Sequence, residues 1–283
     1  FLEIEKLGNG AFGEVVKVRH KKDGQSYAVK HIQNINEQEN EINILASLNN
    51  KNVVRYHNSF SENGKHYIHM EMADMTLQDW MDKRDLSDDF HNFMSENVQN
   101  GTHYMKKCPS IKCYVCPNYM QKEKFDWFEE SLRIGREVVS GLVYLHRCDI
   151  VHNDIKPDNI FVSYRDCKVL VQLGDFGLAT RLDQVNQPLQ SDGTPIVGFG
   201  GKSGDLLSAG VVLQELLLKK KDLKFKNLEK LILSLLDDDS SKRPTAEKLL
   251  EILDFCIEKN IDAGHSENAE NQLYERWPEV FKN

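Results

Sequence analysis

Two short polar stretches in the second half of the chain contain residue types that suit the transfer of a phosphoryl group. Residues 151–159 read VHNDIKPDN, and residues 174–177 read GDFG. Asp154 could accept a proton from an attacking hydroxyl, and Lys156 could neutralise charge on the transferring group. The oxygen ligands that Mg²⁺ prefers are present in Asn159 and Asp175. Either stretch alone could form polar turns, whereas the two together predict phosphoryl-transfer chemistry.

A glycine-rich segment near the N-terminus follows the pattern G-x-G-x-x-G. Its members are Gly8, Asn9, Gly10, Ala11, Phe12 and Gly13, with Val15 two residues further on. Glycines let a backbone approach phosphates closely and expose its N–H donors to them. A dinucleotide site would need a helix directly after the glycines, but residues 14–18 alternate as a strand does, so we expect a hairpin. A tight turn without a ligand is the alternative.

One lysine and one glutamate in this half of the chain are candidates for a buried ion pair. Lys30 follows Ala28 and Val29 in an apolar strand, where an ammonium group needs an anionic partner. Glu41 lies on the apolar stripe of a predicted helix over residues 36–49, so it could meet Lys30. A solvated glutamate is the alternative, because Glu37 shares the same stripe.

The elements that must position these residues change from strands to helices along the chain. Apolar alternation predicts strands within residues 2–32, 53–60 and 66–72, interrupted by the helix over 36–49. Helical spacing of apolar residues predicts helices over 76–83, 127–145, 206–218, 228–236 and 246–257. The polar loop 151–160 therefore lies between a helix and the apolar run 169–173. Residues 84–124 lack periodicity and are expected to form a surface insertion, and the residues after Lys259 are polar and poorly patterned.

Composition narrows the classes of protein further. At 283 residues the chain is long enough for about two compact units. A net charge of −8 disfavours nucleic acid as a direct partner, because that binding rests on an excess of Lys and Arg. Six cysteines are too few for a disulfide scaffold, so a reducing cytoplasm is expected. No apolar run reaches the ~18 residues of a membrane span.

The glycine loop, the strand lysine, the helix glutamate, H-x-D-x-K-x-x-N and D-F-G occur in the order in which they occur in eukaryotic protein kinases, which the chain resembles. The resemblance implies an α+β bilobal kinase fold, with a strand-rich N-lobe over 1–73, a helical C-lobe over 74–258 and a C-terminal extension over 259–283. It implies that ATP lies between the lobes, that Lys30 contacts its α/β-phosphates while paired to Glu41, and that Asp154 is the catalytic base. Asn159 and Asp175 would hold Mg²⁺.

The resemblance also assigns the walls of the ATP site. Met70 would be the gatekeeper, and Glu71 and Ala73 would offer hinge backbone to adenine. The residues expected at the nucleotide are Leu7, Gly8, Asn9, Gly10, Ala11, Phe12, Gly13, Val15, Ala28, Lys30, Met70, Glu71, Ala73 and Phe161. A lysine two residues after the catalytic aspartate, here Lys156, is the serine/threonine pattern.

Within that superfamily the chain is similar to the stress kinases of translation initiation factor 2. The stretches that carry the similarity are 1–4, 23–30, 54–58, 67–72 and 76–81, together with 159–161. Such kinases phosphorylate a serine on the α-subunit of that factor and commonly dimerise through the N-lobe. We therefore expect this substrate and a homodimer. The alternatives are a pseudokinase or regulatory nucleotide-binding module, and a kinase for another protein.

The chain departs from the kinase pattern at several positions. Asn153 stands where most kinases carry the arginine that reads a phosphorylated activation loop, which weakens the expectation of control through Thr194. Residues 196–204 replace the usual substrate-positioning stretch and its glutamate, so Arg243 is expected to lack its partner. Asp205 matches the aspartate that opens the next long helix. The segment between 218 and 228 is short for the helix that docks the initiation factor.

Three further features have local interpretations. Residues 198–203 end like a P-loop in Gly201, Lys202 and Ser203, but the first glycine and the preceding strand are missing, so a flexible connector is expected. Lysines 219–221 are expected to be solvated. His103, Cys108, Cys113 and Cys116 could bind zinc, although free thiols fit their atypical spacing better. Cys148, Cys167 and Cys256 are expected to act as small apolar residues.

Overall fold

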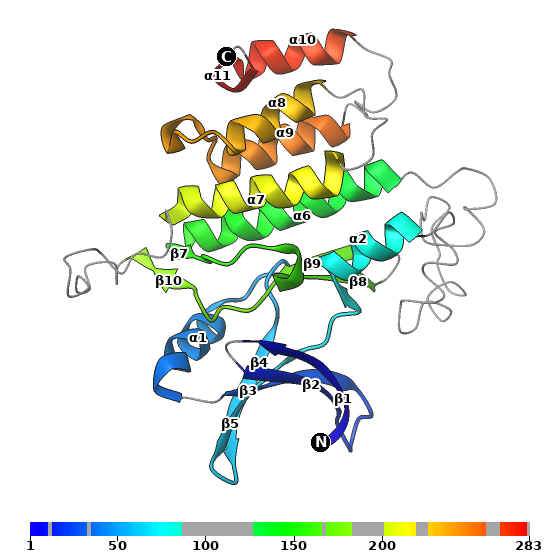
Figure 1. Cartoon of the computed structure of the whole chain (residues 1–283), viewed down its shortest axis with the longest axis vertical. Coiled ribbons are helices and arrows are strands. Elements are labelled where there is room, and N and C mark those ends of the chain that lie inside the picture. The colour runs from blue at the N-terminus through cyan, green and yellow to red at the C-terminus, as the bar shows by residue number, and fades with distance from the viewer. Residues whose placement is uncertain are drawn as a thin grey trace.

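The computed structural model of the chain describes residues 1–10, 13–32, 35–86, 127–165, 168–182, 201–218, 226–258 and 267–281. The N-terminal part is a sheet with one helix beside it, and the rest is mainly helical (Figure 1). This is the bilobal α+β arrangement expected from the sequence. Residues 11–12, 33–34, 87–126, 166–167, 183–200, 219–225, 259–266 and 282–283 lie outside the described part, and with them the candidate zinc ligands, Cys167, Thr194 and lysines 219–221.

The N-terminal sheet has five antiparallel strands in the order β1-β2-β3-β5-β4. Their bounds are β1 Leu2–Gly10, β2 Gly13–Arg19, β3 Ser26–Ile32, β4 Tyr56–Glu62 and β5 Lys65–Glu71. Gly10 pairs with Gly13, so the glycine segment spans the β1–β2 hairpin as predicted. The backbone φ of Gly13 is +133°, and a Cβ there would lie 2.1 Å from the His31 carbonyl oxygen, so only glycine fits.

Helix α1, Ile35–Ser47, lies beside this sheet. Its buried residues include Ile44 and Leu45, which belong to the continuous hydrophobic core, and Glu41 on the same stripe. Because residues three and four apart share one helix face, burying these leucine and isoleucine side chains turns Glu41 toward the sheet. The amphipathic pattern of α1 therefore orients one of the candidate functional groups.

The helical part contains α2 Leu77–Leu86, α6 Trp127–Arg147, α7 Gly201–Leu218, α8 Lys226–Leu235, α9 Ala246–Glu258, α10 Glu267–Arg276 and α11 Pro278–Phe281. Short strands accompany them: β6 Met75–Thr76, β7 Ile150–Val151, β8 Ile160–Arg165, β9 Lys168–Leu173 and β10 Thr180–Arg181. The described residues also contain the 3₁₀ turns η1 Pro157–Asn159 and η3 Ser240–Lys242. Helix α6 packs against α7, α9 and β9, so it forms the centre of this part.

The two parts are joined by backbone hydrogen bonds at β9. The Val54 N–H donates to the Leu173 carbonyl at 2.9 Å, and the Leu173 N–H donates to the Asn52 carbonyl at 2.9 Å. The side chain of Asn52, which is 1% exposed, also donates to the Val171 carbonyl at 2.9 Å. These bonds fix the end of β9, and with it the GDFG stretch, relative to the segment that leads into the N-terminal sheet.

The C-terminal residues pack into the core, which their weak pattern did not predict. Leu273 of α10, Val280 and Phe281 of α11, and Trp277 between the two helices are buried. The rings of Phe255 and Trp277 lie 5.5 Å apart in an edge arrangement. The apolar residues occur at helical spacing, but Asn and Glu dominate the sequence around them. Residues 267–281 therefore belong to the helical part rather than forming a polar tail.

The start of α7 corrects a second expectation. Residues 201–203, the described part of the expected connector, form the first turn of this helix. Asp205 lies near the start of the same helix, as expected. Ser203 is engaged by Arg243, whose guanidinium donates to its carbonyl at 2.9 Å and also to the Asp237 carbonyl. Arg243 thus has carbonyl partners, and no carboxylate among the described residues pairs with its guanidinium.

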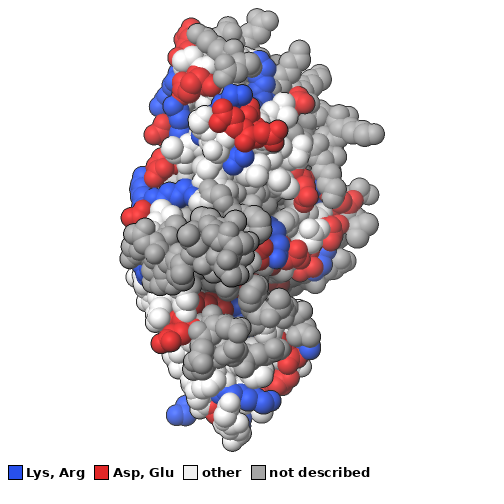
Figure 2. Space-filling view, turned by 60° about the vertical axis from the view of Figure 1, so that its left-hand side comes forward, with Lys and Arg blue, Asp and Glu red and all other residues white. Residues whose placement is uncertain are grey.

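On the face drawn in Figure 2, acidic and basic side chains are interspersed on the described surface rather than gathered by sign. Among the described residues, no helix combines the length and the apolar character that crossing a bilayer requires. Of the cysteines in this part of the chain, Cys148 and Cys256 are free, and burial raises the pKa of the Cys256 thiol to about 12. Cys256 therefore behaves as the apolar residue predicted from the sequence.

Candidate active site

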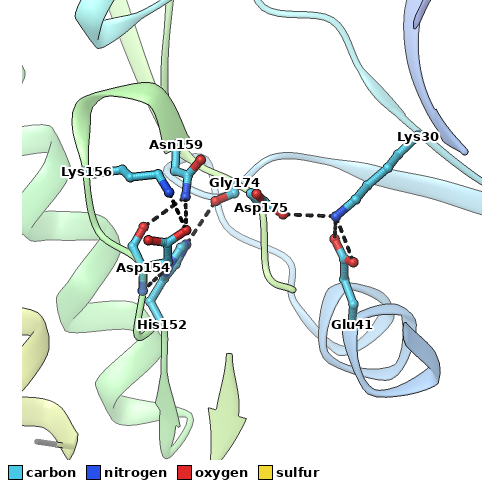
Figure 3. A network of polar contacts seen from close by, with 8 residues as sticks. All are labelled: Lys30, Glu41, His152, Asp154, Lys156, Asn159, Gly174 and Asp175. Atoms are coloured by element: carbon cyan, nitrogen blue, oxygen red, sulfur yellow. Dashed lines mark hydrogen bonds and ion pairs between the residues drawn. The ribbon is translucent and has the colours of Figure 1, made fainter. Parts of the chain in front are cut away.

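The buried ion pair predicted from the sequence is present. The Lys30 Nζ lies 2.7 and 2.9 Å from the two carboxylate oxygens of Glu41, and the two residues are 4% and 2% exposed. The same Nζ also lies 2.9 Å from Asp175 Oδ1, a contact that the sequence did not specify (Figure 3). One ammonium group therefore connects β3, α1 and the GDFG stretch.

Opposing effects act on the charge of Lys30. Burial is the largest effect and favours the neutral amine, but the carboxylates of Glu41 and Asp175 together outweigh it, so the pKa of Lys30 is raised above its usual value. The lysine is cationic at neutral pH. It can therefore offer a fixed positive charge to an anionic group that approaches from the GDFG side.

A second cluster lies in the loop after β7. Asp154 Oδ2 accepts hydrogen bonds from Lys156 Nζ and from Asn159 Nδ2, each at 2.7 Å, and Asn159 also donates to the Asp154 carbonyl at 3.0 Å. The hydrogen bond to Asp154 raises the pKa of the Lys156 ammonium. No described residue donates to Asp154 Oδ1, so this oxygen is an available proton acceptor.

The loop over residues 152–159 is anchored by the buried Asp205 of α7. Its Oδ2 accepts the His152 N–H at 2.9 Å and contacts His146 Nε2 at 3.0 Å, and its Oδ1 accepts the Asn153 N–H at 2.9 Å. Burial lowers the pKa of His152, so its ring is neutral, and its Nε2 lies 3.0 Å from the Gly174 carbonyl. Because a carbonyl only accepts, Nε2 carries the proton.

The GDFG stretch is positioned by close packing. Phe176 is fully buried, with its ring centre 4.8 Å from that of His152, and the Gly174 N–H donates to the Asn159 carbonyl at 2.9 Å. A Cβ on Gly174 would lie 2.3 Å from the Phe161 ring, so a side chain there would require a shift. Asp175 itself has a φ of +55°, which turns its carboxylate toward Lys30.

The donor set fits a hard divalent cation. Both hydrogens of the Asn159 amide are engaged with Asp154, which turns its oxygen away, and one oxygen of Asp175 binds Lys30. The amide oxygen of Asn159 and the second carboxylate oxygen of Asp175 have no hydrogen-bond partner within the described ranges. These are the ligand types that Mg²⁺ takes in proteins.

The expected nucleotide walls lie on the sheet and on β8. In the register of the sheet, Val15 pairs with Lys30 and Ala28 pairs with the buried Met70. The Glu71 N–H is used by the Arg55 carbonyl, whereas the N–H and the carbonyl of Ala73 have no hydrogen-bond partner in the part of the chain that the structure describes. Leu7 and Gly8 are exposed on β1, Asn9 and Gly10 are described only by their strand pairing, and Ala11 and Phe12 lie outside the described residues.

Two asparagines near the cluster were not predicted to have a role in holding it. Asn40 and Asn153 donate to backbone carbonyls just after the GDFG stretch. Asn153 was noted only for the arginine it replaces, and Asn40 has no sequence signal beyond its position before Glu41. Only their shared contact with one segment singles them out.

Comparison with known proteins agrees with this arrangement. A family model described as protein tyrosine and serine/threonine kinase matches residues 2–197, which contain Lys30, Glu41, Asp154 and Asp175. The chain belongs to this protein kinase family. Its bilobal fold is that of a protein kinase, and its relatives include serine/threonine kinases.

Three relatives illustrate the similarity. The interferon-induced, double-stranded RNA-activated protein kinase of Rattus norvegicus is 30% identical over 77% of this chain. The eIF-2-alpha kinase GCN2 of Arabidopsis thaliana is 30% identical over 75% of the chain, and the probable serine/threonine-protein kinase nek3 of Dictyostelium discoideum is 30% identical over 83%. The match covers only 40%, 17% and 19% of the length of these three relatives, respectively, so this chain spans less than half of each.

Proposed function

We propose that this kinase transfers the γ-phosphoryl group of ATP to a serine or threonine hydroxyl of a protein, with Mg²⁺ as cofactor. The observation that carries the proposal is the contact of Lys30 with both Glu41 and Asp175, which joins the strand proposed to bind phosphate to the stretch proposed to bind Mg²⁺. Burying a lysine to 4% exposure between two carboxylates has a large desolvation cost. A purely structural role would not require this arrangement.

The chemistry assigned to the chain is general-base catalysis with charge stabilisation. Asp154 Oδ1 would accept the proton of the substrate hydroxyl while the hydroxyl oxygen forms a bond to the γ-phosphorus. At the same time the bond between the γ-phosphorus and the β–γ bridging oxygen would break, which releases ADP. Lys156, cationic and next to Asp154, would balance the charge of the transferring group. Lys30 would hold the α- and β-phosphates, and the hairpin at Gly8–Gly13 would cover them.

Asn159 and Asp175 are the residues that would hold Mg²⁺. When bound, the cation supplies positive charge that neutralises phosphate oxygens. Adenine would meet the N–H and carbonyl of Ala73, for which the described residues supply no hydrogen-bond partner. Met70 would lie behind it, and Ala28, Val15 and Phe161 would form apolar walls. Lys156 supports serine/threonine rather than tyrosine specificity.

For the substrate we propose the α-subunit of translation initiation factor 2, phosphorylated in the cytoplasm as a stress control of translation. The support is the resemblance in the stretches around Lys30 and the hinge, together with the similarity to the Arabidopsis relative that is named an eIF-2-alpha kinase. We further propose a homodimer formed through the N-lobe. The edge strand β1 offers the exposed apolar residues Leu2 and Ile4 to a second copy.

The direct test compares the wild-type chain with Asp154→Asn. With Mg²⁺-ATP and the α-subunit, the wild type is expected to incorporate phosphate, and the variant to lose at least about a hundredfold in kcat, because the amide cannot accept the proton. Asp158→Asn is the matched control, since Asp158 is an exposed carboxylate of the same loop. Equal activity of wild type and Asp154→Asn would overturn the catalytic assignment.

The same assay separates the narrower proposals. Phosphate transfer to serine or threonine peptides without transfer to the α-subunit would refute the substrate but leave the kinase. Nucleotide binding without any transfer would favour a pseudokinase. Sedimentation of the wild type against Leu2→Asp/Ile4→Asp tests the dimer, and a wild-type monomer at assay concentration would refute it.

A further inference from the structure

Three histidines and two other aromatic residues come together on one face of the N-terminal sheet. His69 of β5 is 8% exposed, and its ring centre lies 4.8 Å from that of His57 on β4. The rings of Tyr27 and Phe1 pack against His69 at steep angles, with ring centres 4.5 and 4.9 Å away. The ring centre of His20 lies 5.3 Å from that of Phe1. These five residues are called the histidine cluster below.

A β-bulge accompanies the placement of His57 over His69. In the register of β4 against β5, Tyr56 pairs with Met70 and Asn58 pairs with His69. His57 is therefore the extra residue of the bulge, and a bulge changes the direction of a side chain relative to a regular strand. The planes of the His57 and His69 rings are 32° apart. A positive charge on either ring would thus oppose a positive charge on the other.

The environment of His69 suits a neutral ring. Neither of its ring nitrogens has a hydrogen-bond partner within the described ranges. A protonated ring carries two N–H donors, and both would lack an acceptor there. Asp23, which follows β2, already contacts His20 Nδ1 at 2.8 Å and accepts the Gln25 N–H at 2.8 Å. Protonation of His69 would therefore create a buried cation without hydrogen bonds.

The ionisable groups around the two stacked histidines come from several elements. They are His20 and Asp23 between β2 and β3, Tyr27 on β3, and Arg55 and Glu71 near His57. Burial is the largest effect and lowers the pKa of His69 and of His57; nearby positive charge acts in the same direction, and the carboxylates oppose it. The unfolded chain thus takes up these protons more readily below pH 6.5 than the folded chain does. The stability that the neutral rings confer is present above that pH and is lost as the pH falls.

The cluster lies on the opposite face of the sheet from the proposed ATP site. Across β3 and β5, Val29 pairs with His69, and Ala28 pairs with Met70. Because successive side chains of a strand point to opposite faces, His69 faces away from the side on which Ala28, Met70 and Lys30 lie. A change in the pairing of β3 with β5 would therefore move the residues proposed to contact adenine and the phosphates.

We infer that the histidine cluster is an acid-sensitive support of the ATP site: protonation of His69 and His57 loosens the pairing of β3 with β5 and weakens ATP binding. The inference rests on the proposed ATP site. His69 and His57 act through the sheet and are not assigned any contact with the nucleotide.

The first experiment measures the dissociation constant of Mg²⁺-ATP at about pH 7.5 and about pH 5.5. His69→Phe fills a similar space without titrating, and since ATP itself binds protons, the wild type is compared with this variant at each pH. Linkage to one proton allows at most about tenfold per pH unit, so the wild type is expected to lose about fivefold more affinity than His69→Phe. An equal loss in the two proteins would overturn the inference.

Two further variants test whether the effect belongs to the cluster. His66→Gln is the matched control, because His66 also lies on β5 but its Nδ1 is hydrogen-bonded to Ser61 Oγ at 2.6 Å, so this variant should keep the pH effect of the wild type. His57→Phe changes an exposed position with little risk to folding, removes one of the two charges and should diminish the pH effect. An undiminished effect in His57→Phe, or its loss in His66→Gln, would refute the cluster as the cause.

Hydrogen exchange of the β3 and β5 amides gives a readout that needs no nucleotide. Their protection factors, which correct for the intrinsic pH dependence of exchange, should fall at the lower pH in the wild type but not in His69→Phe. In a chain that binds no ATP, loss of protection in the wild type alone would keep the acid-sensitive cluster and reject the proposed ATP site. Equal protection of the wild type at the two pH values would reject the cluster, whatever the nucleotide binding.

Discussion

Burial of Glu130 in α6 predicts a pH-dependent change in stability. The residue is 7% exposed, and burial raises the pKa of its carboxyl from 4.5 to about 7, although Arg133 opposes this rise. The folded protein therefore binds a proton that the unfolded chain releases between pH 4.5 and about 7. By linkage, this carboxyl destabilises the fold progressively as pH rises through that window, and the full cost is present above it.

The magnitude follows from the two pKa values. At ~1.4 kcal/mol per tenfold change in proton affinity, a rise from 4.5 to about 7 amounts to about 3 kcal/mol at pH 8. About 1 kcal/mol of this has accumulated by pH 5.5. Glu130→Gln keeps the shape and can still accept the hydrogen bond of the Tyr164 hydroxyl. The variant should thus be more stable than wild type, by an amount that grows by about 2 kcal/mol between pH 5.5 and 8.

The measurement is urea denaturation at a series of pH values, followed by tryptophan fluorescence. Trp80 and Trp127 report on this region, because their rings lie 5.9 Å apart and Trp80 Nε1 donates to Tyr164. Glu129→Gln is the matched control on the same turn, where the half-exposed carboxylate pairs with Arg133, and it should show no such pH trend. A Glu130→Gln variant whose stability difference is constant or negative across the range would refute the reasoning.

Three further changes have defined outcomes. Glu41→Gln removes one of the two carboxylates at Lys30 and should lower kcat/KM about tenfold, whereas Glu39→Gln, exposed on the same helix, should not; equal steady-state kinetics would contradict this. Gly174→Ala forces a Cβ into the Phe161 ring. It should raise the activation free energy calculated from kcat by more than it lowers the free energy of unfolding, and unchanged kinetics would argue against the tight packing. Asp205→Asn replaces one accepting oxygen with an N–H₂ group that faces a backbone N–H donor. The free energy of unfolding should fall by about 1–3 kcal/mol, and an unaltered thermal midpoint would disprove this.

Most elements of the fold could be predicted from local patterns. The strands around Val15, Val29 and Ile68 and the long helix α6 follow alternation and helical spacing, which depend on near neighbours in the chain. Helices α10 and α11 were not predicted, because their few apolar residues, although helically spaced, are outnumbered by Asn, Glu and other polar residues. The first turn of α7 was missed because glycines favour loops in general, while here Arg243 and Lys202 anchor that turn.

By itself, the sequence determined the chemistry available to this protein. The order of the glycine hairpin, Lys30, Glu41, Asp154, Asn159 and Asp175 predicted the kinase family and the Lys30–Glu41 pair, because residue type and spacing limit which groups can reach one another. Only the tertiary structure decided that Lys30 also binds Asp175, that Asp205 holds the catalytic loop and that Asn40 and Asn153 bind consecutive carbonyls. These contacts join residues far apart in the chain, and hydrogen bonds form over about 3 Å, so they depend on how the core brings α1, the loop and β9 together.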